Sequence, residues 1–156
     1  MTEEFNTKEL VAELVPHKGK MLLLDAVRNY DLKDVNITTE IAISRDSIFF
    51  EDELGGVPAW VAFEYMAQSI SALSGIYGRT KGEKPKVGFI MSVSAFNAKV
   101  PVFKEGETVV VTVHETVRMD AAVTFDGMAL VGGKIAATAT LNTIEVDDPK
   151  TSLGLN

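Results

Sequence analysis

The chain has 156 residues, a formal net charge of −7 and no cysteine. This length fits one domain with its own core. The lack of cysteine excludes disulfides and thiolate chemistry, and the acidic balance argues against nucleic-acid binding. The two histidines, His17 and His114, are too few for a histidine-rich metal site. The acidic start lacks a signal-peptide core, and no apolar run approaches the roughly 18 residues of a membrane span. We therefore expect a cytoplasmic protein without a metal.

The N-terminal part is predicted to form a short helix and two strands. Thr7 is a typical helix N-cap, and Pro16 is expected to end the helix that follows it. Residues 21–30 form a continuous apolar run and residues 35–43 alternate in polarity, so both are predicted as strands of one hairpin.

A long apolar helix is predicted over residues 58–77, with Pro58 in its first turn. Apolar side chains recur at helical spacing from Trp60 onward, and a helix of this kind is normally buried. It nevertheless contains one carboxylate, Glu64. Burying an ionised carboxylate costs several kcal/mol unless a partner compensates. Either Glu64 is satisfied for structural reasons, or it is tuned for chemistry.

The C-terminal half is predicted to be β-structure. Strands are expected over residues 87–98, 108–117, 121–125 and 129–144. Asp126-Gly127 is a strong hairpin signal between the last two. Short connections favour an antiparallel sheet, and a single apolar helix needs a curved sheet around it. We therefore predict an α+β fold with one domain over residues 1–146, and a polar tail over residues 147–156.

Three segments carry a resemblance to a known family. They are LVPHKGKMLLLD from Leu14, GVPAWVAFEYMAQSISALSG around Glu64, and PVFKEGET from Pro101. Together they resemble the hot-dog 3-hydroxyacyl-acyl-carrier-protein dehydratases, which carry a PH…P-hLLhD segment, an E-x-x-AQ helix and a PV-x-x-G-D/E-x strand entry. The aryl polyene branch, with LPH…PMLLL and LPAW…ELMAQ, is the most similar. The resemblance implies a hot-dog fold and dehydration of a 3-hydroxyacyl thioester in fatty-acid-like or aryl polyene biosynthesis.

One departure from the general fatty-acid dehydratases moves the expected site. Those enzymes place a catalytic histidine, in an HFPG motif, fourteen residues before the helix glutamate, where this chain has Phe50. The aryl polyene branch also lacks that histidine and keeps the one in its LPH segment. The resemblance therefore assigns catalysis to His17 and Glu64, with His17 of one protomer facing Glu64 of its partner across a dimer interface.

The reaction itself sets requirements that these residue types meet. A base must take the C2 proton, an acid must protonate the leaving hydroxide, and donors must stabilise the charge on the thioester oxygen. Histidine suits the base, and a desolvated glutamate suits the acid because burial disfavours its charged form. Backbone N–H groups around Gly56 and Ala59 suit the oxyanion, and Gln68, one turn after Glu64, can hold its carboxyl in place. No organic cofactor is needed.

Each of these residues also has a structural interpretation. His17 could cap helix carbonyls after Pro16, and Gln68 could join the helix to the sheet. Trp60 and Phe63 could belong to the core or line an acyl tunnel, and the sequence does not distinguish these two roles. His114, in a strand with alternating neighbours, is predicted to face solvent.

One basic cluster contrasts with the acidic background. Arg79, Lys81, Lys84 and Lys86 lie within RTKGEKPK. An acidic acyl carrier protein would dock on such a patch, but a solvated helix end with cations near its C-terminus is the favoured interpretation. The expected substrate is a thioester of a carrier protein or of coenzyme A.

Two alternatives to the dehydratase remain open. Many hot-dog proteins are thioesterases, in which a helix carboxylate activates water, and their product is a free acid and a thiol. The chain could also be a non-catalytic subunit that supports a second hot-dog protein, since the HFPG histidine is absent. A hot-dog protomer leaves one sheet edge and one side of its helix exposed, so we expect a homodimer, a higher homo-oligomer or such a heterodimer.

Overall fold

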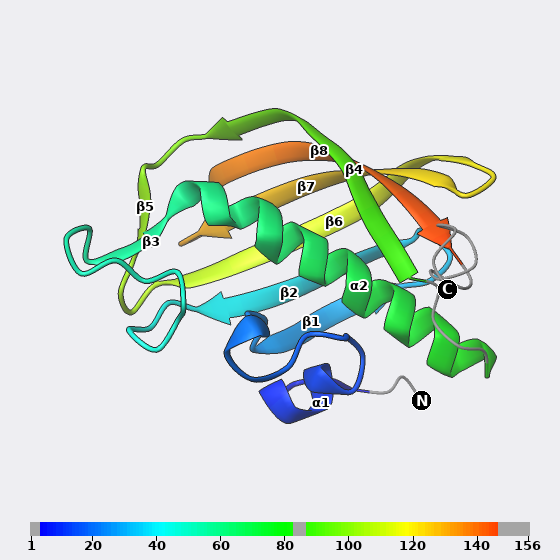
Figure 1. Ribbon diagram of the computed structural model, residues 1–156, viewed down its shortest axis with the longest axis horizontal. Helices are drawn as coiled ribbons and strands as arrows, with labels where there is room; N and C mark the ends of the chain where they lie inside the picture. The colour runs from blue at the N-terminus through cyan, green and yellow to red at the C-terminus, as the bar shows by residue number, and fades with distance from the viewer. Residues whose placement is uncertain (1–3, 83–86, 147–156) are drawn as a thin grey trace, which may run out of the picture.

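A six-stranded antiparallel sheet curves around one long helix (Figure 1). The computed structural model describes residues 4–82 and 87–146, so the predicted tail over residues 147–156 lies outside it. The strands lie side by side in the order β1 (Ala26–Asp31), β2 (Asn36–Ala42), β6 (Thr108–Met119), β7 (Ala122–Val131), β8 (Lys134–Val146) and β4 (Val87–Ala98). The predicted α+β class, with one sheet around one helix, is confirmed.

The long helix, α2 (Ala62–Lys81), lies across the concave face of the sheet (Figure 1). It begins at Ala62, four residues later than predicted, because the residues before it form other elements. Residues 56–58 form β3 (Gly56–Pro58), which pairs with β5 (Val102–Lys104) as a small second sheet. A single 3-10 turn (Ala59–Val61) then leads into α2. No helix within residues 4–82 and 87–146 is long and apolar enough to cross a membrane.

Two further sequence predictions are wrong. The first strand begins at Ala26, since the apolar residues before it form a turn and an extended segment. Strand β7 runs straight through Asp126-Gly127, and the hairpin turn lies instead at Gly132 and Gly133, whose φ angles are +59° and +79°. Gly127 has another reason to be glycine: a Cβ there would lie 2.5 Å from the sulfur of Met66 on α2.

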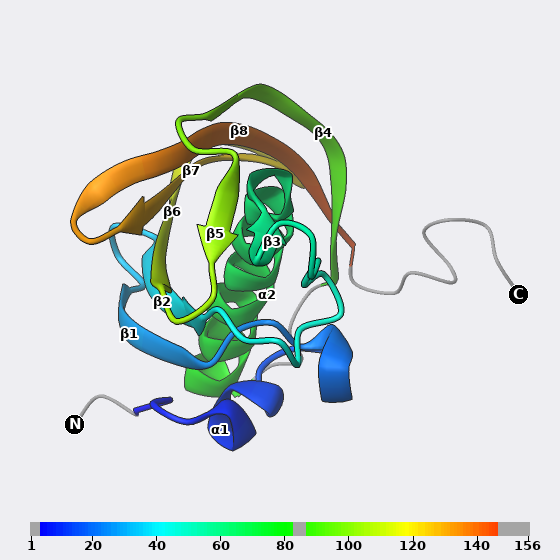
Figure 2. The same ribbon diagram turned by 90° about the vertical axis from the view of Figure 1, so that its left-hand side faces the viewer.

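The N-terminal segment lies on the side of α2 that the sheet leaves open. Helix α1 (Lys8–Ala12) is capped by the Thr7 hydroxyl, which accepts from the Leu10 amide, as predicted. Figure 2 shows β7 and β8 on one side of α2 and α1 on the other. The buried residues of the following segment pack into the same core as the helix and the sheet; they include Leu14, Val15, Leu22, Leu23 and Leu24.

Candidate active site

His17 and Glu64 face each other at the N-terminal half of α2. His17 Nε2 lies 3.8 Å from Glu64 Oε1, and each side chain is 27% exposed. Both come from one chain here, whereas the prediction has His17 of one protomer face Glu64 of its partner. The reason is local, because the turn after Pro16 folds back onto α2 and carries His17 to the helix of its own protomer.

The turn that carries His17 is closed by its neighbour. The Lys18 ammonium donates to the carbonyl of Ala12, at the end of α1, and to that of Val15 at 2.9 Å. Lys18 therefore satisfies helix-terminal carbonyls, a role that basic side chains take at helix C-termini. Nδ1 of His17 is buried and has no hydrogen-bond partner among the described residues. Nε2 is thus the ring nitrogen that can exchange a proton with Glu64 or a ligand.

Gln68 holds the Glu64 carboxyl, and its own orientation is determined by the backbone. Its Oε1 accepts from the Leu23 amide at 2.8 Å, so its Nε2 must be the donor on the other side. That nitrogen donates to the Met21 carbonyl at 2.9 Å and to Glu64 Oε1 at 3.1 Å. Gln68 is 1% exposed, and it both joins the N-terminal segment to α2 and orients Glu64. The two backbone partners could not be found from the sequence, because no pattern marks which peptide groups meet a side chain.

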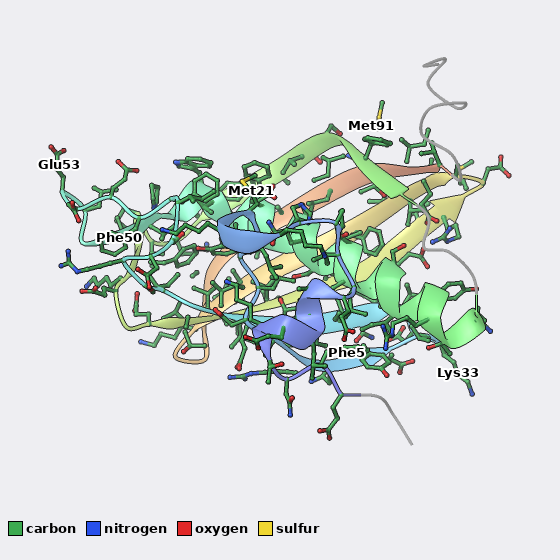
Figure 3. All side chains as sticks on the ribbon, turned by 60° about the horizontal axis from the view of Figure 1, so that its bottom comes forward. Phe5, Met21, Lys33, Phe50, Glu53 and Met91 are labelled. Atoms are coloured by element: carbon green, nitrogen blue, oxygen red, sulfur yellow. The ribbon has the colours of Figure 1, made fainter. Side chains whose placement is uncertain are left out.

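An aromatic cluster lies beside the pair. The Trp60 ring stacks on Phe63 at 6.2 Å between centroids and meets the edge of Phe49 at 5.8 Å. Trp60 is 51% exposed, so it is not core within the protomer. Phe50, at the position of the HFPG histidine, lies instead under the Arg45 guanidinium, 5.4 Å from its ring centroid. Figure 3 shows Phe50 in the loop that precedes β3, and Met21 next to the start of α2.

The predicted oxyanion donors are not at the start of the helix. The Ala59 amide donates to the Pro101 carbonyl at 3.0 Å, so it is already used in the fold. Gly56 pairs with Lys104 in the small sheet, where a Cβ would lie 2.0 Å from the Phe103 carbonyl oxygen. Glycine is required there by close approach of the backbones. The first turn of α2 begins only after this region.

The remaining predicted residues lie away from the pair. Arg79 and Lys81 are in the last turn of α2, where the Arg79 guanidinium lies over the ring of Phe5 and the Lys81 ammonium over that of Tyr77. Lys84 and Lys86 lie outside the described residues. His114 is exposed on the sheet, with Nε2 3.1 Å from Asp34 Oδ1, as its alternating pattern predicted.

A separate cavity of about 280 Å³ lies behind the segment that binds Gln68. Its lining includes Lys8, Lys20, Asp25, Ser47 and Tyr65, but neither His17 nor Glu64. Burial raises the pKa of the Tyr65 hydroxyl, and the nearby Asp25 carboxylate raises it further. No three His, Asp or Glu side chains within residues 4–82 and 87–146 lie close enough to hold a metal ion.

One side of α2 is left uncovered by the sheet and by the N-terminal segment. Its residues are half-buried or exposed and mostly apolar: Phe63, Glu64, Ala67, Ile70, Ser71, Ser74 and Tyr77 in α2, with Trp60 in the turn before it. Among the described strands, edge strand β4 also has no neighbour on its outer side. The carboxylate therefore lies at the margin of an open apolar face.

The sheet, the central helix and the acid on that helix define a hot-dog protein. Solved hot-dog structures overlay on the chain at low identity. One is a hypothetical thioesterase with coenzyme A from Streptococcus pneumoniae TIGR4, with a TM-score of 0.60 at 11% identity over 78% of this chain and 85% of that one. This likeness shows the fold alone.

The family follows from a more specific match. The model of the ApeP-like family, described as ApeP dehydratase, matches residues 9–154, so the chain belongs to this family of dehydratases. A chain of the dehydratase heterocomplex ApeI:P from Xenorhabdus doucetiae overlays with a TM-score of 0.83 at 27% identity, covering 94% of this chain and 97% of that one. The curated relatives include the 3-hydroxyacyl-[acyl-carrier-protein] dehydratase FabZ of Caulobacter sp. (strain K31), 27% identical over 95% of this chain and 96% of the relative. That of Rhizorhabdus wittichii is 26% identical over 89% and 88%.

Proposed function

We propose that this chain dehydrates a 3-hydroxyacyl thioester on an acyl carrier protein, with His17 as the base and Glu64 as the acid. One observation carries the assignment: in a member of a dehydratase family, an imidazole nitrogen and a carboxyl oxygen lie 3.8 Å apart at the margin of an apolar face. Relatives named for this reaction on a carrier protein support the substrate class.

His17 and Glu64 together carry out both proton transfers of the proposed reaction. Neutral His17 Nε2 takes the C2 proton, the C2 electrons form the new double bond, and the C3–O bond breaks. Protonated Glu64 gives its proton to the departing hydroxide, and water leaves. The imidazolium and the carboxylate that remain are close enough to return the proton from His17 to Glu64, directly or through one water, which resets the site.

The surroundings of Glu64 favour the charge that it gains during the reaction. Gln68 donates to its Oε1, and Glu64 lies in the first turn of α2, where the helix dipole stabilises an anion. These interactions strengthen as the carboxyl gives up its proton, so they act on the transition state more than on the ground state. Closure of the open face around a bound acyl chain would exclude water and favour the neutral acid beforehand.

Trp60 and Phe63 are proposed to contact the acyl chain. Both are partly exposed aromatic side chains: Phe63 directly precedes Glu64 on the uncovered side of α2, and Trp60, in the 3-10 turn before α2, stacks on Phe63. A carrier-docking role for Arg79 and Lys81 also remains a proposal. These two residues lie 15 and 17 positions after Glu64, a distance of roughly 22–26 Å along the helix axis.

The test is turnover with a 3-hydroxyacyl carrier-protein thioester, followed by the absorbance of the conjugated enoyl thioester. We expect Glu64→Gln and His17→Ala each to lower turnover at least about 100-fold with little change in thermal unfolding. His114→Ala is the matched control, because this second histidine is exposed and distant from the pair. Full activity of both site variants would overturn the assignment, and release of free acid and thiol would indicate a thioesterase.

We further propose that a second hot-dog chain covers the open face, either a second copy or a different protein. The apolar side of α2 and the free edge of β4 support this pairing, as does the similarity to a dehydratase heterocomplex. The chain should be assayed alone and mixed with a related hot-dog chain, with native mass measured in both cases. A monomer with full turnover contradicts pairing. If His17→Ala in a mixed complex leaves turnover unchanged, this chain is the non-catalytic subunit.

A further inference from the structure

Gly75 lies where the N-terminal segment touches the backbone of α2. An ideal Cβ at this position would lie 2.2 Å from the Leu14 carbonyl oxygen, 2.9 Å from its carbon and 3.0 Å from Leu14 Cα. All three atoms belong to the backbone, so no side-chain rotation can relieve the contact. Any residue larger than glycine must therefore move the chain at Leu14 or the helix itself.

Helix propensity alone would not favour glycine here. Gly75 lies in the interior of α2, between Ser74 and Ile76. Glycine in a helix interior costs about 1 kcal/mol relative to alanine. The φ of Gly75 is not positive, so backbone conformation does not require glycine either. Close approach of Leu14 is the physical reason that the structure offers.

The contact lies on the same side of α2 as the acid. Gly75 follows Glu64 by eleven residues, which is three helical turns and about 20°. The segment that begins at Leu14 reaches Glu64 through His17 and reaches Gln68 through the Met21 carbonyl and the Leu23 amide. One side of α2 thus holds the N-terminal segment at two places: Gly75 contacts Leu14, and Gln68 binds Met21 and Leu23. His17 lies between these two contacts in the sequence.

We propose that Gly75 is a positioning residue for His17: by letting the Leu14 backbone rest on α2, it sets the distance from His17 to Glu64. Leu14 is three residues before His17, and its side chain is buried in the core. The intervening turn is stiffened by Lys18, whose ammonium binds the Ala12 and Val15 carbonyls. A displacement at Leu14 is therefore transmitted to His17 rather than absorbed between them. The expected loss of rate rests on the proposed function, but the expected change in the distance from His17 to Glu64 does not.

The size of the displacement follows from the contact. Real Cβ atoms do not approach closer than 3.0 Å, so alanine at position 75 requires a relative shift of at least about 0.8 Å between Leu14 and α2. Misplacement of a catalytic group by about 1 Å can cost roughly 100-fold in rate. We expect Gly75→Ala to lower kcat roughly 10- to 100-fold while KM changes less than about twofold, because the acyl-binding side chains do not move.

Two control variants separate positioning from general damage. Gly88→Ala adds a methyl group where the nearest atom in contact range, the Ile144 carbonyl oxygen, is 4.0 Å away, so turnover should not change. Thr39→Val removes a buried hydrogen bond to Ser69 on the sheet-facing side of α2, so it should lower stability without lowering kcat. A loss of rate in Thr39→Val equal to that in Gly75→Ala would overturn the proposal.

A structural readout tests the inference without any activity. In an otherwise native protein, Glu64→Gln should shift the His17 ring resonances in the NMR spectrum at a fixed pH, and the His114 resonances should not shift. With Gly75→Ala added, the His17 response should fall by at least about one-sixth, since an interaction that varies as 1/r weakens by that fraction when the 3.8 Å separation lengthens by about 0.8 Å. An undiminished response overturns the positioning role. An absence of dehydratase activity in the native protein would refute only the proposed function.

Lys18→Met gives an independent variant in case Gly75→Ala does not fold. Lys18 is exposed, and methionine keeps most of its apolar stem, so folding should be retained. Loss of the carbonyl contacts should loosen the turn and reduce both the His17 response to Glu64→Gln and kcat, by about 3- to 10-fold in rate. Native values for both measurements in Lys18→Met would contradict a rigid link between Leu14 and His17.

Discussion

Gln68→Ala should damage both the fold and the site, because one amide serves both. Gln68 accepts from the Leu23 amide at 2.8 Å and donates to the Met21 carbonyl and to Glu64. Alanine removes all three bonds and leaves the buried Leu23 N–H without its acceptor. The Met21 carbonyl belongs to a residue with an exposed side chain, so water can replace its lost donor more easily.

The magnitude can be worked from these contacts. A buried donor left unpaired costs about 1–3 kcal/mol, and the space left by the truncated side chain adds about 1 kcal/mol. The free energy of unfolding should therefore fall by about 2–4 kcal/mol, and since 1 kcal/mol shifts Tm by roughly 2–4 °C at this chain length, Tm should fall by about 4–16 °C. Loss of a hydrogen bond to a charged group, about 1.5–3 kcal/mol, predicts a rate lowered roughly 10- to 100-fold.

Circular dichroism melting and single-turnover kinetics measure the two effects separately. Thr39→Val is the matched control: it removes a buried hydrogen bond to Ser69 on the sheet-facing side of the same helix, and only stability should fall. Gln68→Met fills most of the space but restores none of the three hydrogen bonds, so the rate should stay low even where the packing part of the stability returns. If Gln68→Ala loses stability but keeps the native rate, the argument that Gln68 orients Glu64 is refuted.

Two other predictions concern stability. Because burial and Asp25 raise the pKa of Tyr65, the fold favours the neutral phenol. This contribution is complete below the unfolded pKa of about 10 and is lost as pH rises through the folded pKa. Urea unfolding between about pH 8 and 11 should therefore show a smaller decline in Tyr65→Phe than in the native protein, and parallel declines would contradict it. Gly133→Val should cost about 1–3 kcal/mol because φ is +79° there, whereas Gly88→Val, without a positive φ, should cost little by the same measurement.

The fold was largely predictable, because its strongest signals are periodic. Strand β4 has the predicted bounds, β2 differs by one residue at each end, and the central helix exists where the apolar period is longest. The errors have physical causes. Asp126-Gly127 is a good hairpin turn in isolation, but here Gly127 makes room for Met66, and Gly132-Gly133 supplies the turn. The sequence alone does not show which of two turn signals serves packing.

The candidate site was predictable only in part. The contact between Glu64 and Gln68 followed from their spacing of four residues on one helix. The approach of His17 was predicted from family resemblance as a contact between protomers, whereas the structure has this contact within one chain. Whether a segment reaches its own helix or that of a partner depends on the path of the intervening chain, which periodicity does not encode. Gly75 marks that path, yet only the structure shows that the Leu14 carbonyl lies against it.

The placement of both groups on one chain changes what a partner has to contribute under the proposed mechanism. The pair is already assembled within the protomer, so a second chain is not needed to supply either group. What the isolated protomer lacks is shielding, because both side chains are 27% exposed beside an open apolar stripe of α2. A partner that covers this stripe would lower the local dielectric, which strengthens the interaction between the imidazolium and the carboxylate. Pairing should accordingly act on kcat as well as on substrate binding, and a paired complex with His17→Ala only in this chain should lose the gain.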